Sequence, residues 1–362
     1  MNFKPFPYET YALDQAFIGR ADEKKLIQSH IKKSTNLCLI SKRRMGKSSL
    51  IKEVFREAGD DYICIYADVF DITSKEDFAN ILLKEASNSL KGSVQDIAIQ
   101  LRSIFKRVIP DFSVDSNGIP HIKPSTKSLD YEEMMTDFFS LVFNLSKKHK
   151  VVIAIDEFQQ ITLIKDAKIG ALLRKYMQEP NNISYVFLGS KRHMLLDLFK
   201  YKSPLYEMAT PMLLGSLKNE EIRIYVKKYI DISDELIDEI INVCDKETKL
   251  MQHIFHILYE GFHKRSISRE DVLSAIDEVI NAKDANYRVI YGELSLNQKK
   301  ALKVISQGSS NIYSKNILDE YNIKKESLFS ALSQLFKKEY VDKDEDSWFI
   351  PDRAFEIWCS RL

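Results

Sequence analysis

The chain has 362 residues, of which 44% are hydrophobic and 29% are charged, and its formal net charge is +1 at pH 7. This length predicts two or three domains rather than one core. The composition is that of a globular protein, and the net charge near zero excludes a chain that binds polyanions through bulk charge alone.

The positions of the cysteines and of the apolar residues indicate the cellular compartment in which we expect the protein. The four cysteines lie far apart and form no C-x-x-C pair, which argues against a metal site and against a disulfide framework. The N-terminus has no apolar run of signal-peptide length, and no stretch approaches the roughly 20 apolar residues of a membrane span. We therefore expect a cytoplasmic protein with no membrane partner.

A basic loop follows the first apolar run. Residues 37–40 read as a short strand, residues 41–50 read "SKRRMGKSSL", and a helical pattern follows. Gly-Lys-Ser between a strand and a helix is typical of a phosphate-binding loop, in which Lys47 reaches the terminal phosphates and Ser48 holds magnesium. The usual loop begins with glycine, but serine at position 41 is tolerated unless the turn needs a positive φ. The alternative is a basic turn before an amphipathic helix.

Two elements follow the loop before a turn-rich segment. Residues 61–70 form an apolar run typical of a second strand, and residues 74–90 have a helical pattern. Ser74 lies three residues before Asp77 at the start of this helix, which is an N-terminal capping signal. Residues 110–127 contain Pro, Asn-Gly and Ser, and they predict a small hairpin or an excursion loop.

Helices and strands continue to alternate as far as residue 190. Apolar residues recur at helical spacing from Met134 to Leu145, and residues 151–156, "VVIAID", are apolar enough for a central parallel strand. A helix over 168–179 and a strand over 183–190 come next. This alternation predicts a doubly wound parallel sheet with helices on both faces, as in the α/β P-loop fold.

Two carboxylates end the apolar strand at 151–156. Asp156 can order magnesium through water, and Glu157 can polarise an attacking water during phosphoryl transfer. In the alternative interpretation, the two acids only cap the next helix. The phosphate loop upstream favours the catalytic interpretation.

The next strand ends in "FLGSKRHM". In a sheet with this strand order, Ser190 would lie beside the γ-phosphate and could sense it through a hydrogen bond. A serine that caps the following helix is an equally good interpretation. Lys191 and Arg192 are candidates for a charge sensor or a finger into a neighbouring subunit, although a solvated basic turn is favoured.

The remainder of the chain is helical. We expect three domains, residues 1–217 with the phosphate loop, residues 218–290 as a helical lid, and residues 291–362. The last domain reads as helix, short helix, helix and apolar hairpin, which is the order of a winged helix-turn-helix. His253 and His256 lie in an apolar helical run without a third ligand, so we expect core or boundary residues rather than a metal site.

Five motifs together resemble a known family. "FIGRADE" at 17–23, the basic loop, "VVIAIDEF", "FLGS" and "SPLYEM" occur in this order. In this order they resemble the archaeal-type predicted ATPases, which belong to the signal-transducing (STAND) branch of the AAA+ superfamily and are related to origin-recognition-type initiators. The resemblance extends over nearly the whole chain. It implies an AAA+ ATPase domain, a helical lid and a C-terminal winged helix.

The resemblance also implies residues for ATP, ADP and Mg²⁺. Phe17, Gly19, Arg20 and Glu23 match a signature that lies near the adenine in this family, and the double arginine of the loop matches as well. A loop that begins with serine occurs in bacterial members. The expected nucleotide contacts are Arg20, Arg43, Arg44, Met45, Gly46, Lys47, Ser48 and Ser49, with Ser48 and Asp156 at Mg²⁺ and Lys47, Asp156, Glu157 and Ser190 in catalysis.

Two departures from the family bear on turnover. After "SPLY" the family commonly continues Gly-Arg, whereas this chain has Glu207 and Met208. The lid lacks the usual Gly-Gly-x-Pro, which leaves Lys249 as a weak candidate for the second sensor. We therefore expect ATP binding with slow hydrolysis.

The winged helix offers two kinds of surface. On its second helix, the face opposite the apolar one would enter a DNA major groove while its lysines contact phosphates. The expected DNA contacts are Lys324, Lys325, Ser327, Ser330 and Lys337. The acidic wing, residues 342–346, would oppose a phosphate backbone, so a protein-binding module is the alternative.

Three functions are compatible with these motifs. The leading one is an ATP-dependent AAA+ switch whose nucleotide state repositions the winged helix for a protein effector or a homo-oligomer. The second is a DNA-binding ATPase of the initiator or mobile-element type that contacts duplex DNA. The third is a non-catalytic module that holds nucleotide structurally.

Overall fold

The computed structural model describes residues 3–90, 111–114, 120–123, 130–164, 168–179, 181–262, 265–308, 311–344 and 347–362. Contacts divide the chain into two compact units. The α/β unit contains Arg20–Arg43 and Lys47–Gly215, and the C-terminal unit contains Met1–Gly19, Arg44–Gly46 and Ser216–Leu362. No helix among the described residues is long and apolar enough to cross a membrane.

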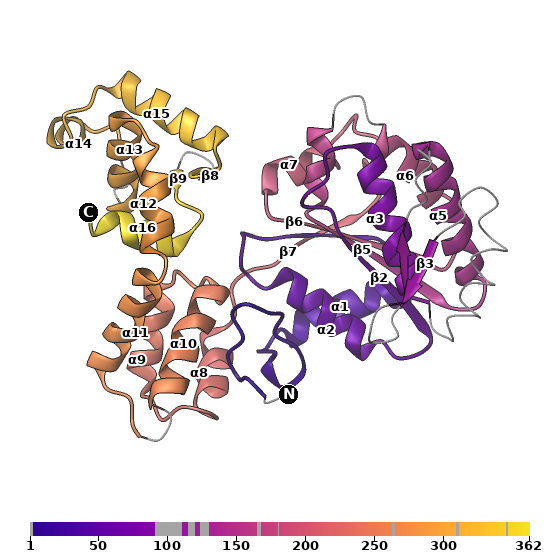
Figure 1. Ribbon diagram of the computed structural model, residues 1–362, viewed down its shortest axis with the longest axis horizontal. Coiled ribbons are helices and arrows are strands. Elements are labelled where there is room, and N and C mark those ends of the chain that lie inside the picture. Colours follow the sequence, from indigo (N-terminus) through magenta and orange to yellow (C-terminus); the bar gives the residue numbers. More distant parts are fainter. Residues whose placement is uncertain are drawn as a thin grey trace. The chain divides into compact units, whose positions relative to one another are not determined.

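A five-stranded parallel sheet forms the centre of the α/β unit (Figure 1). Its strands, in the order β2-β5-β6-β1-β7, are β2 (Tyr62–Asp68), β5 (Lys150–Asp156), β6 (Ile183–Gly189), β1 (Leu37–Ile40) and β7 (Thr210–Leu213). The four predicted strands are confirmed. The fifth, β7, was not predicted because it is short and mostly exposed and contains Pro211. Proline lacks a backbone donor and is therefore confined to a sheet edge, where β7 lies beside β1.

Helices cover both faces of this sheet, as predicted (Figure 1). Helices α1 (Ala21–Lys32) and α2 (Lys47–Glu57) lie on one face. Helices α3 (Lys75–Asn88), α5 (Tyr131–Ser146), α6 (Ile169–Met177) and α7 (Arg192–Asp197) share one core with the other face. The short helix η2 (Phe158–Leu163) follows β5 and buries Phe158 in that core.

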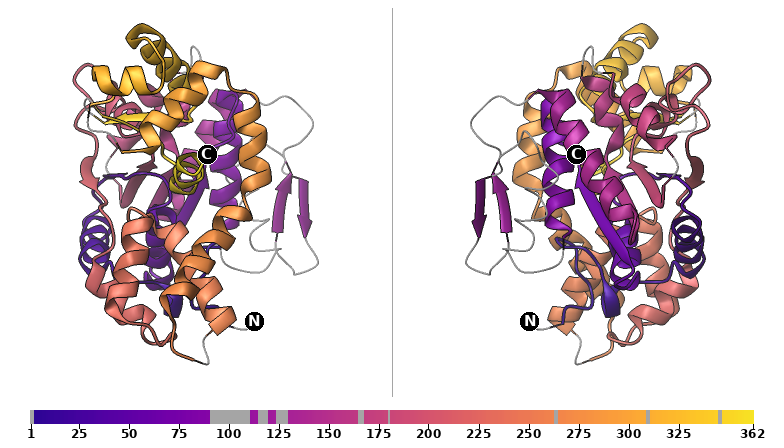
Figure 2. Two further views of the ribbon diagram at one scale, coloured as in Figure 1. Left: turned by 90° about the vertical axis from the view of Figure 1, so that its left-hand side faces the viewer. Right: turned by 90° about the vertical axis from the view of Figure 1, so that its right-hand side faces the viewer.

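A small antiparallel pair stands apart from the main sheet. Strands β3 (Asp111–Val114) and β4 (Pro120–Lys123) pair with each other and form their own two-stranded sheet (Figure 2). This pairing confirms the hairpin predicted within residues 110–127. The Asn-Gly at its centre lies outside the described residues.

The first part of the C-terminal unit consists of helices that follow the parallel sheet in sequence. They are α8 (Asn219–Val226), α9 (Asp234–Val243), α10 (Thr248–Phe262) and α11 (Arg269–Asn281). The N-terminal segment, which contains the short helix η1 (Asp14–Ala16), packs with them. Phe6 is fully buried in their core, and the Tyr225 hydroxyl donates a hydrogen bond to the carbonyl of Pro5 at 2.7 Å.

The second part begins at α12 (Asp284–Gly292) and has the predicted order of a winged helix. It continues with α13 (Leu296–Ser306), α14 (Lys315–Glu320), α15 (Lys325–Lys337), the hairpin β8 (Asp342–Asp344) and β9 (Ser347–Phe349), and α16 (Arg353–Ser360). Between α14 and α15, Asn322 turns the chain with a φ of +43°. Leu328, Leu332 and Leu335 of α15 are buried, so the predicted apolar face of the second helix is the core face.

Candidate nucleotide-binding and catalytic site

The serine that opens the basic loop does not distort it. Ser41 is buried, and its hydroxyl donates to the Lys42 carbonyl at 2.9 Å. The positions of the loop with positive φ are Arg44 at 63° and Gly46 at 85°. Ser41 is not among them, so the turn does not require glycine at its first position.

Lys47 and Ser48 begin α2 and lie next to the acids that end β5. Lys47 is buried, and burial lowers the pKa of its ammonium group, while the negative charges of Glu157 and Asp156 oppose that shift. The Ser48 hydroxyl donates to Asp156 Oδ2 at 2.6 Å. A hydroxyl and a carboxylate in contact are oxygen ligands of the kind that Mg²⁺ takes in P-loop sites. The residues present therefore fit a Mg²⁺–nucleotide complex.

Glu157 is held at the point where β5 turns into η2. Its backbone is left-handed, with φ of 53° and ψ of 38°, and its side chain does not cap η2. Ser190, which follows β6, donates from Oγ to Glu157 Oε2 at 2.9 Å. Helix α7 has Lys191 as its N-cap, without a side-chain cap hydrogen bond. Ser190 therefore contacts the acid rather than capping the helix.

Four residues around these acids are not predicted from the sequence. The Tyr66 hydroxyl donates to Asp156 Oδ2, and Lys52 Nζ lies 3.8 Å from the centre of the Tyr66 ring. Asp68 pairs in register with Asp156 on the neighbouring strand. The Gln159 side chain, buried beneath Glu157, donates to Glu157 Oε2. Their signal in the sequence is a polar residue near a strand end, but only the strand order shows which strand ends meet.

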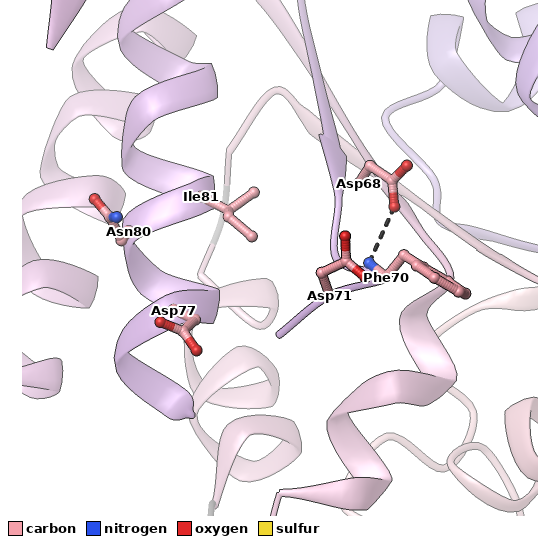
Figure 3. Close-up of a pocket in the computed structure, with 6 residues that line it drawn as sticks. All are labelled: Asp68, Phe70, Asp71, Asp77, Asn80 and Ile81. Carbon is pink, nitrogen blue, oxygen red and sulfur yellow. Dashed lines mark hydrogen bonds between the residues drawn. The ribbon is translucent and has the colours of Figure 1, made fainter. Parts of the chain in front are cut away.

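Burial raises the pKa of Asp68, and the nearby negative charges of Asp156, Glu157 and Asp71 act in the same direction, whereas a hydrogen bond from the Phe70 amide opposes them. A pocket of about 540 Å³ opens beside this carboxylate, between the end of β2 and α3 (Figure 3). It is lined by Asp68, Phe70, Asp71, Asp77, Asn80 and Ile81. The described residues of its lining include no cationic side chain.

Arg20, which the resemblance places near the nucleotide, is engaged within the α/β unit. Its side chain is 4% exposed, donates to Glu23 Oε1 at 2.8 Å and donates to the Gly215 carbonyl at 2.7 Å. The guanidinium thus ties the start of α1 to the segment after β7. Its contact with nucleotide stays a prediction.

Three residues of the loop, Arg44–Gly46, group with the C-terminal unit. Arg44 Nη1 lies 2.8 Å from Asp352 Oδ1, at the N-cap of α16, and 3.6 Å from Glu247 Oε1, just before α10. Lys249, the candidate second sensor, donates its backbone amide to the Arg44 carbonyl at 3.2 Å, and its side chain is exposed. Arg43 and Ser49 are half-buried, and Met45 is buried.

The remaining predicted residues lie in the C-terminal unit. Of the expected DNA contacts, Ser327 is half-buried and Lys324, Lys325, Ser330 and Lys337 are exposed. Phe329 of the same helix is 58% exposed. His253 stacks on Tyr8 with ring centroids 3.8 Å apart, and burial lowers the pKa of its imidazole to about 4. This stacking fits the predicted boundary histidine.

The comparison with family models covers the end of the chain. Residues 285–361 match a family described as a probable winged helix domain. This match confirms the predicted C-terminal winged helix. Among curated proteins, no sequence matches the chain.

Solved structures match over nearly the whole chain. The Walker-type ATPase of Pyrococcus abyssi has a TM-score of 0.66 at 17% identity, covering 99% of this chain and 100% of that one. The ORC2 protein of Aeropyrum pernix, in its ADPNP–ADP complexes, has a TM-score of 0.58 at 13% identity, covering 98% and 96%. The ORC1 protein of the same organism, in complex with DNA, has a TM-score of 0.52 at 13% identity, covering 95% and 93%.

These matches define the class of fold. The chain has the fold of AAA+ P-loop ATPases, a five-stranded parallel sheet with helices on both faces, and it ends in a winged helix. The predicted resemblance to archaeal ATPases is thus confirmed by its structural neighbours. At these identities the similarity establishes fold, so the function has to be argued from the residues.

Proposed function

We propose that this protein binds ATP with Mg²⁺ and hydrolyses it slowly, as an AAA+ switch whose nucleotide state repositions its winged helix. One observation carries the proposal. Ser48, Asp156, Glu157 and Ser190 form a hydrogen-bonded set beside the buried Lys47. The set lies at the carboxyl ends of parallel strands, where α/β sheets bind their ligands.

Each residue of the set has a role that its position supports. Lys47 contacts the terminal phosphates, and the loop amides, from Arg44 to Ser49, cradle them. Bound Mg²⁺ would neutralise charge on the phosphates, and Ser48 and Asp156 would hold it. Glu157 orients and polarises the attacking water. Ser190 Oγ can exchange its bond to Glu157 for a γ-phosphate oxygen and thereby sense ATP.

Slow turnover is supported by the way in which Glu157 is held. Two side chains, Ser190 and Gln159, donate to the same carboxylate oxygen. The bond from Ser190 stabilises the ground state of the acid, and it has to break before Ser190 turns to a phosphate. Glu207–Met208 replaces the Gly-Arg of the resembled family, so an arginine that could contact nucleotide or a partner subunit is missing there. In the lid, Lys249 is the candidate for the second sensor.

A switch is supported by Arg44. This loop residue pairs with Asp352 of the winged helix and lies near Glu247, within one compact unit. A phosphate that reorders the loop would change this ion pair. Nucleotide state and the environment of α16 would then be coupled, because the contacts of the Arg44 guanidinium would differ between the nucleotide-bound and the nucleotide-free protein.

The test is ATP binding and steady-state turnover of the purified full chain. We expect wild type to bind a fluorescent ATP analogue and to turn over slowly. Lys47→Ala should lose binding by at least about tenfold because a phosphate contact is removed. Lys25→Ala, an exposed lysine of α1, is the matched control and should leave both quantities unchanged. Equal binding by wild type and Lys47→Ala would contradict the proposal.

The second candidate, a DNA-dependent ATPase, is favoured by the exposed lysines of α15. The same turnover assay with duplex DNA separates the candidates. Stimulation by DNA would favour the second, and turnover indifferent to DNA favours the switch with a protein effector or homo-oligomer. ADP that survives purification without turnover, unchanged by Glu157→Gln, would favour the third candidate, a structural nucleotide holder.

A further inference from the structure

We infer that Gln159 is a positioning residue for Glu157, and that Gly189 is glycine in order to make room for it. The inference rests on the proposed ATPase function and adds to it a component that holds the catalytic acid. The two residues come from different strand ends, since Gln159 lies in η2 after β5 and Gly189 ends β6.

Gln159 is fixed in place. Its side chain is 1% exposed, and its backbone lies in η2, which Phe158 anchors in the core against Phe187 with ring centroids 4.5 Å apart. The Gln159 carbonyl accepts a hydrogen bond from the Thr162 hydroxyl at 2.8 Å. A long amide side chain held on such a backbone has little freedom to point elsewhere.

The side-chain amide of Gln159 donates its hydrogen bond to the proposed catalytic acid. Nε2 of Gln159 donates to Glu157 Oε2, the oxygen that also accepts from Ser190 at 2.9 Å. Two donors on one oxygen fix the plane of the Glu157 carboxylate. They leave Oε1 of Glu157 to accept a proton from water. Ser190 lies at the tip of a strand and can turn to a phosphate, whereas buried Gln159 cannot leave. Gln159 is therefore the permanent half of the clamp and Ser190 the exchangeable half.

This arrangement is unfavourable for the Gln159 amide itself. Gln159 Oε1 is buried and accepts no hydrogen bond from any described residue. Burying an amide with an unpaired oxygen is unfavourable, and an apolar side chain of similar size would avoid it. The packing of the core therefore does not explain this glutamine. The need for a hydrogen-bond donor to Glu157 explains it.

Gly189, at the end of β6, leaves space for the Gln159 amide. A Cβ at position 189 would lie 2.3 Å from Gln159 Oε1 and 2.9 Å from Leu195 Cδ2. Real contacts of this kind are not that short, so any larger residue would displace the amide. Gly189 and Ser190 thus act together, the first by admitting Gln159 and the second by sharing its acceptor.

The experiment compares Gln159→Met, which keeps volume and removes the donor, with wild type. We expect kcat for ATP to fall about 10- to 100-fold, which is less than the roughly 10²- to 10⁴-fold contribution of a general base because Glu157 itself remains, with an unchanged Kd for the ATP analogue. Gln160→Met, the adjacent half-buried glutamine, is the matched control and should keep kcat. In a Glu157→Gln background, Gln159→Met should add no further loss. A parallel loss of nucleotide affinity, or full kcat in Gln159→Met, would overturn the clamp.

Gly189 provides an independent arm. Gly189→Ala should lower kcat about as much as Gln159→Met, because it displaces the same amide. The double variant Gly189→Ala, Gln159→Ala removes the clash with the amide and leaves only the Leu195 side chain to shift, so its kcat should be no lower than that of Gln159→Ala alone. Additive losses in the double variant would overturn the spatial link between the two positions.

A measurement without ATP separates the clamp from the proposed function. Urea unfolding of the Glu157→Gln and Gln159→Met single and double variants forms a double-mutant cycle. We expect the double variant to shift the midpoint by less than the sum of the single shifts, since the two side chains share one hydrogen bond. If wild type binds ATP without turnover, the ATPase proposal fails and this cycle alone decides the clamp. Additive shifts would overturn it.

Discussion

Glu247 is a buried carboxylate whose charge the protein tolerates poorly. Burial raises the pKa of Glu247 to about 7, and the negative charge of Asp352 adds to this effect, although Arg44 opposes it. The folded state therefore binds a proton on Glu247 more tightly than the unfolded chain does. The resulting stability is fully present below the unfolded pKa of 4.5 and is lost as pH rises through about 7.

We predict that Glu247→Gln removes this pH dependence. In wild type the Glu247 contribution should fall by about 1 to 3 kcal/mol between pH 4.5 and 7. The measurement is urea unfolding across this range, followed by tryptophan fluorescence, because both tryptophans, Trp348 and Trp358, lie in the winged helix. Burial also lowers the pKa of His253, which titrates with the opposite sign, so the difference between wild type and variant is the relevant quantity. Parallel curves would contradict the prediction.

At the level of single residues, the sequence predicts the groups proposed for the chemistry but not the residues that contact them. Lys47, Ser48, Asp156 and Glu157 were predicted from one loop and one strand end, and they lie together. The role of Gln159 could not be predicted, because a glutamine two residues after an acid forms no recognisable motif and its proximity to Gly189 depends on the fold. A side chain's role as a support depends on what lies across from it.

At the level of elements, helix α3 shows how completely a local signal can specify a boundary. Ser74 Oγ accepts from the Asp77 amide at 3.0 Å, and Asp77 Oδ2 accepts from the Ser74 amide at 3.0 Å. Hydrogen bonds from Thr73 and Ser74 hold the pKa of Asp77 below its usual value. The predicted capping box is therefore confirmed.

We predict that Ser74→Ala destabilises the first turn of α3 by about 1 kcal/mol, because one backbone amide loses its acceptor. Hydrogen exchange of a peptide spanning residues 73–88 should become about fivefold faster. Thr136→Ala on α5 is the control, since its exposed hydroxyl only bonds back to the Glu132 carbonyl. Equal changes in both variants would count against the cap.

At the level of the whole molecule, the units do not follow the chain in simple order. The N-terminal segment packs with the C-terminal helices, and one core there joins helices α8 to α11 with the winged helix. That core contains Val279, Leu302 and Trp358, for example. Deleting the winged helix would expose it, so a loss of DNA binding in a truncated chain would not identify a DNA contact. Substitutions on α15 are the sharper test.

We predict that, if duplex DNA binds, alanine at Lys324, Lys325 or Lys337 weakens binding at all sequences. Each lost phosphate contact should reduce the slope of log affinity against log salt by about 0.9. Fluorescence anisotropy at several salt concentrations measures this slope, with Lys25→Ala as the control. Affinity that depends on the exposed Phe329 and not on the lysines would instead assign the α15 face to a protein partner.

Features that neighbouring residues encode can be predicted from the amino-acid sequence alone. The loop chemistry, the capping box, the helical periods and four of the five sheet strands depend on residues close together in the chain, so their patterns are visible in the letters. The order of motifs then indicated the fold class that the structure has.

Features that join distant segments depend on the folded structure. It placed β7 at the edge beside β1, Phe6 in the core of the C-terminal unit, and Tyr66 and Gln159 at the acids. Each of these contacts depends on which surfaces fold against each other. No local pattern records that choice, because it is made by burial and strand order over the whole chain.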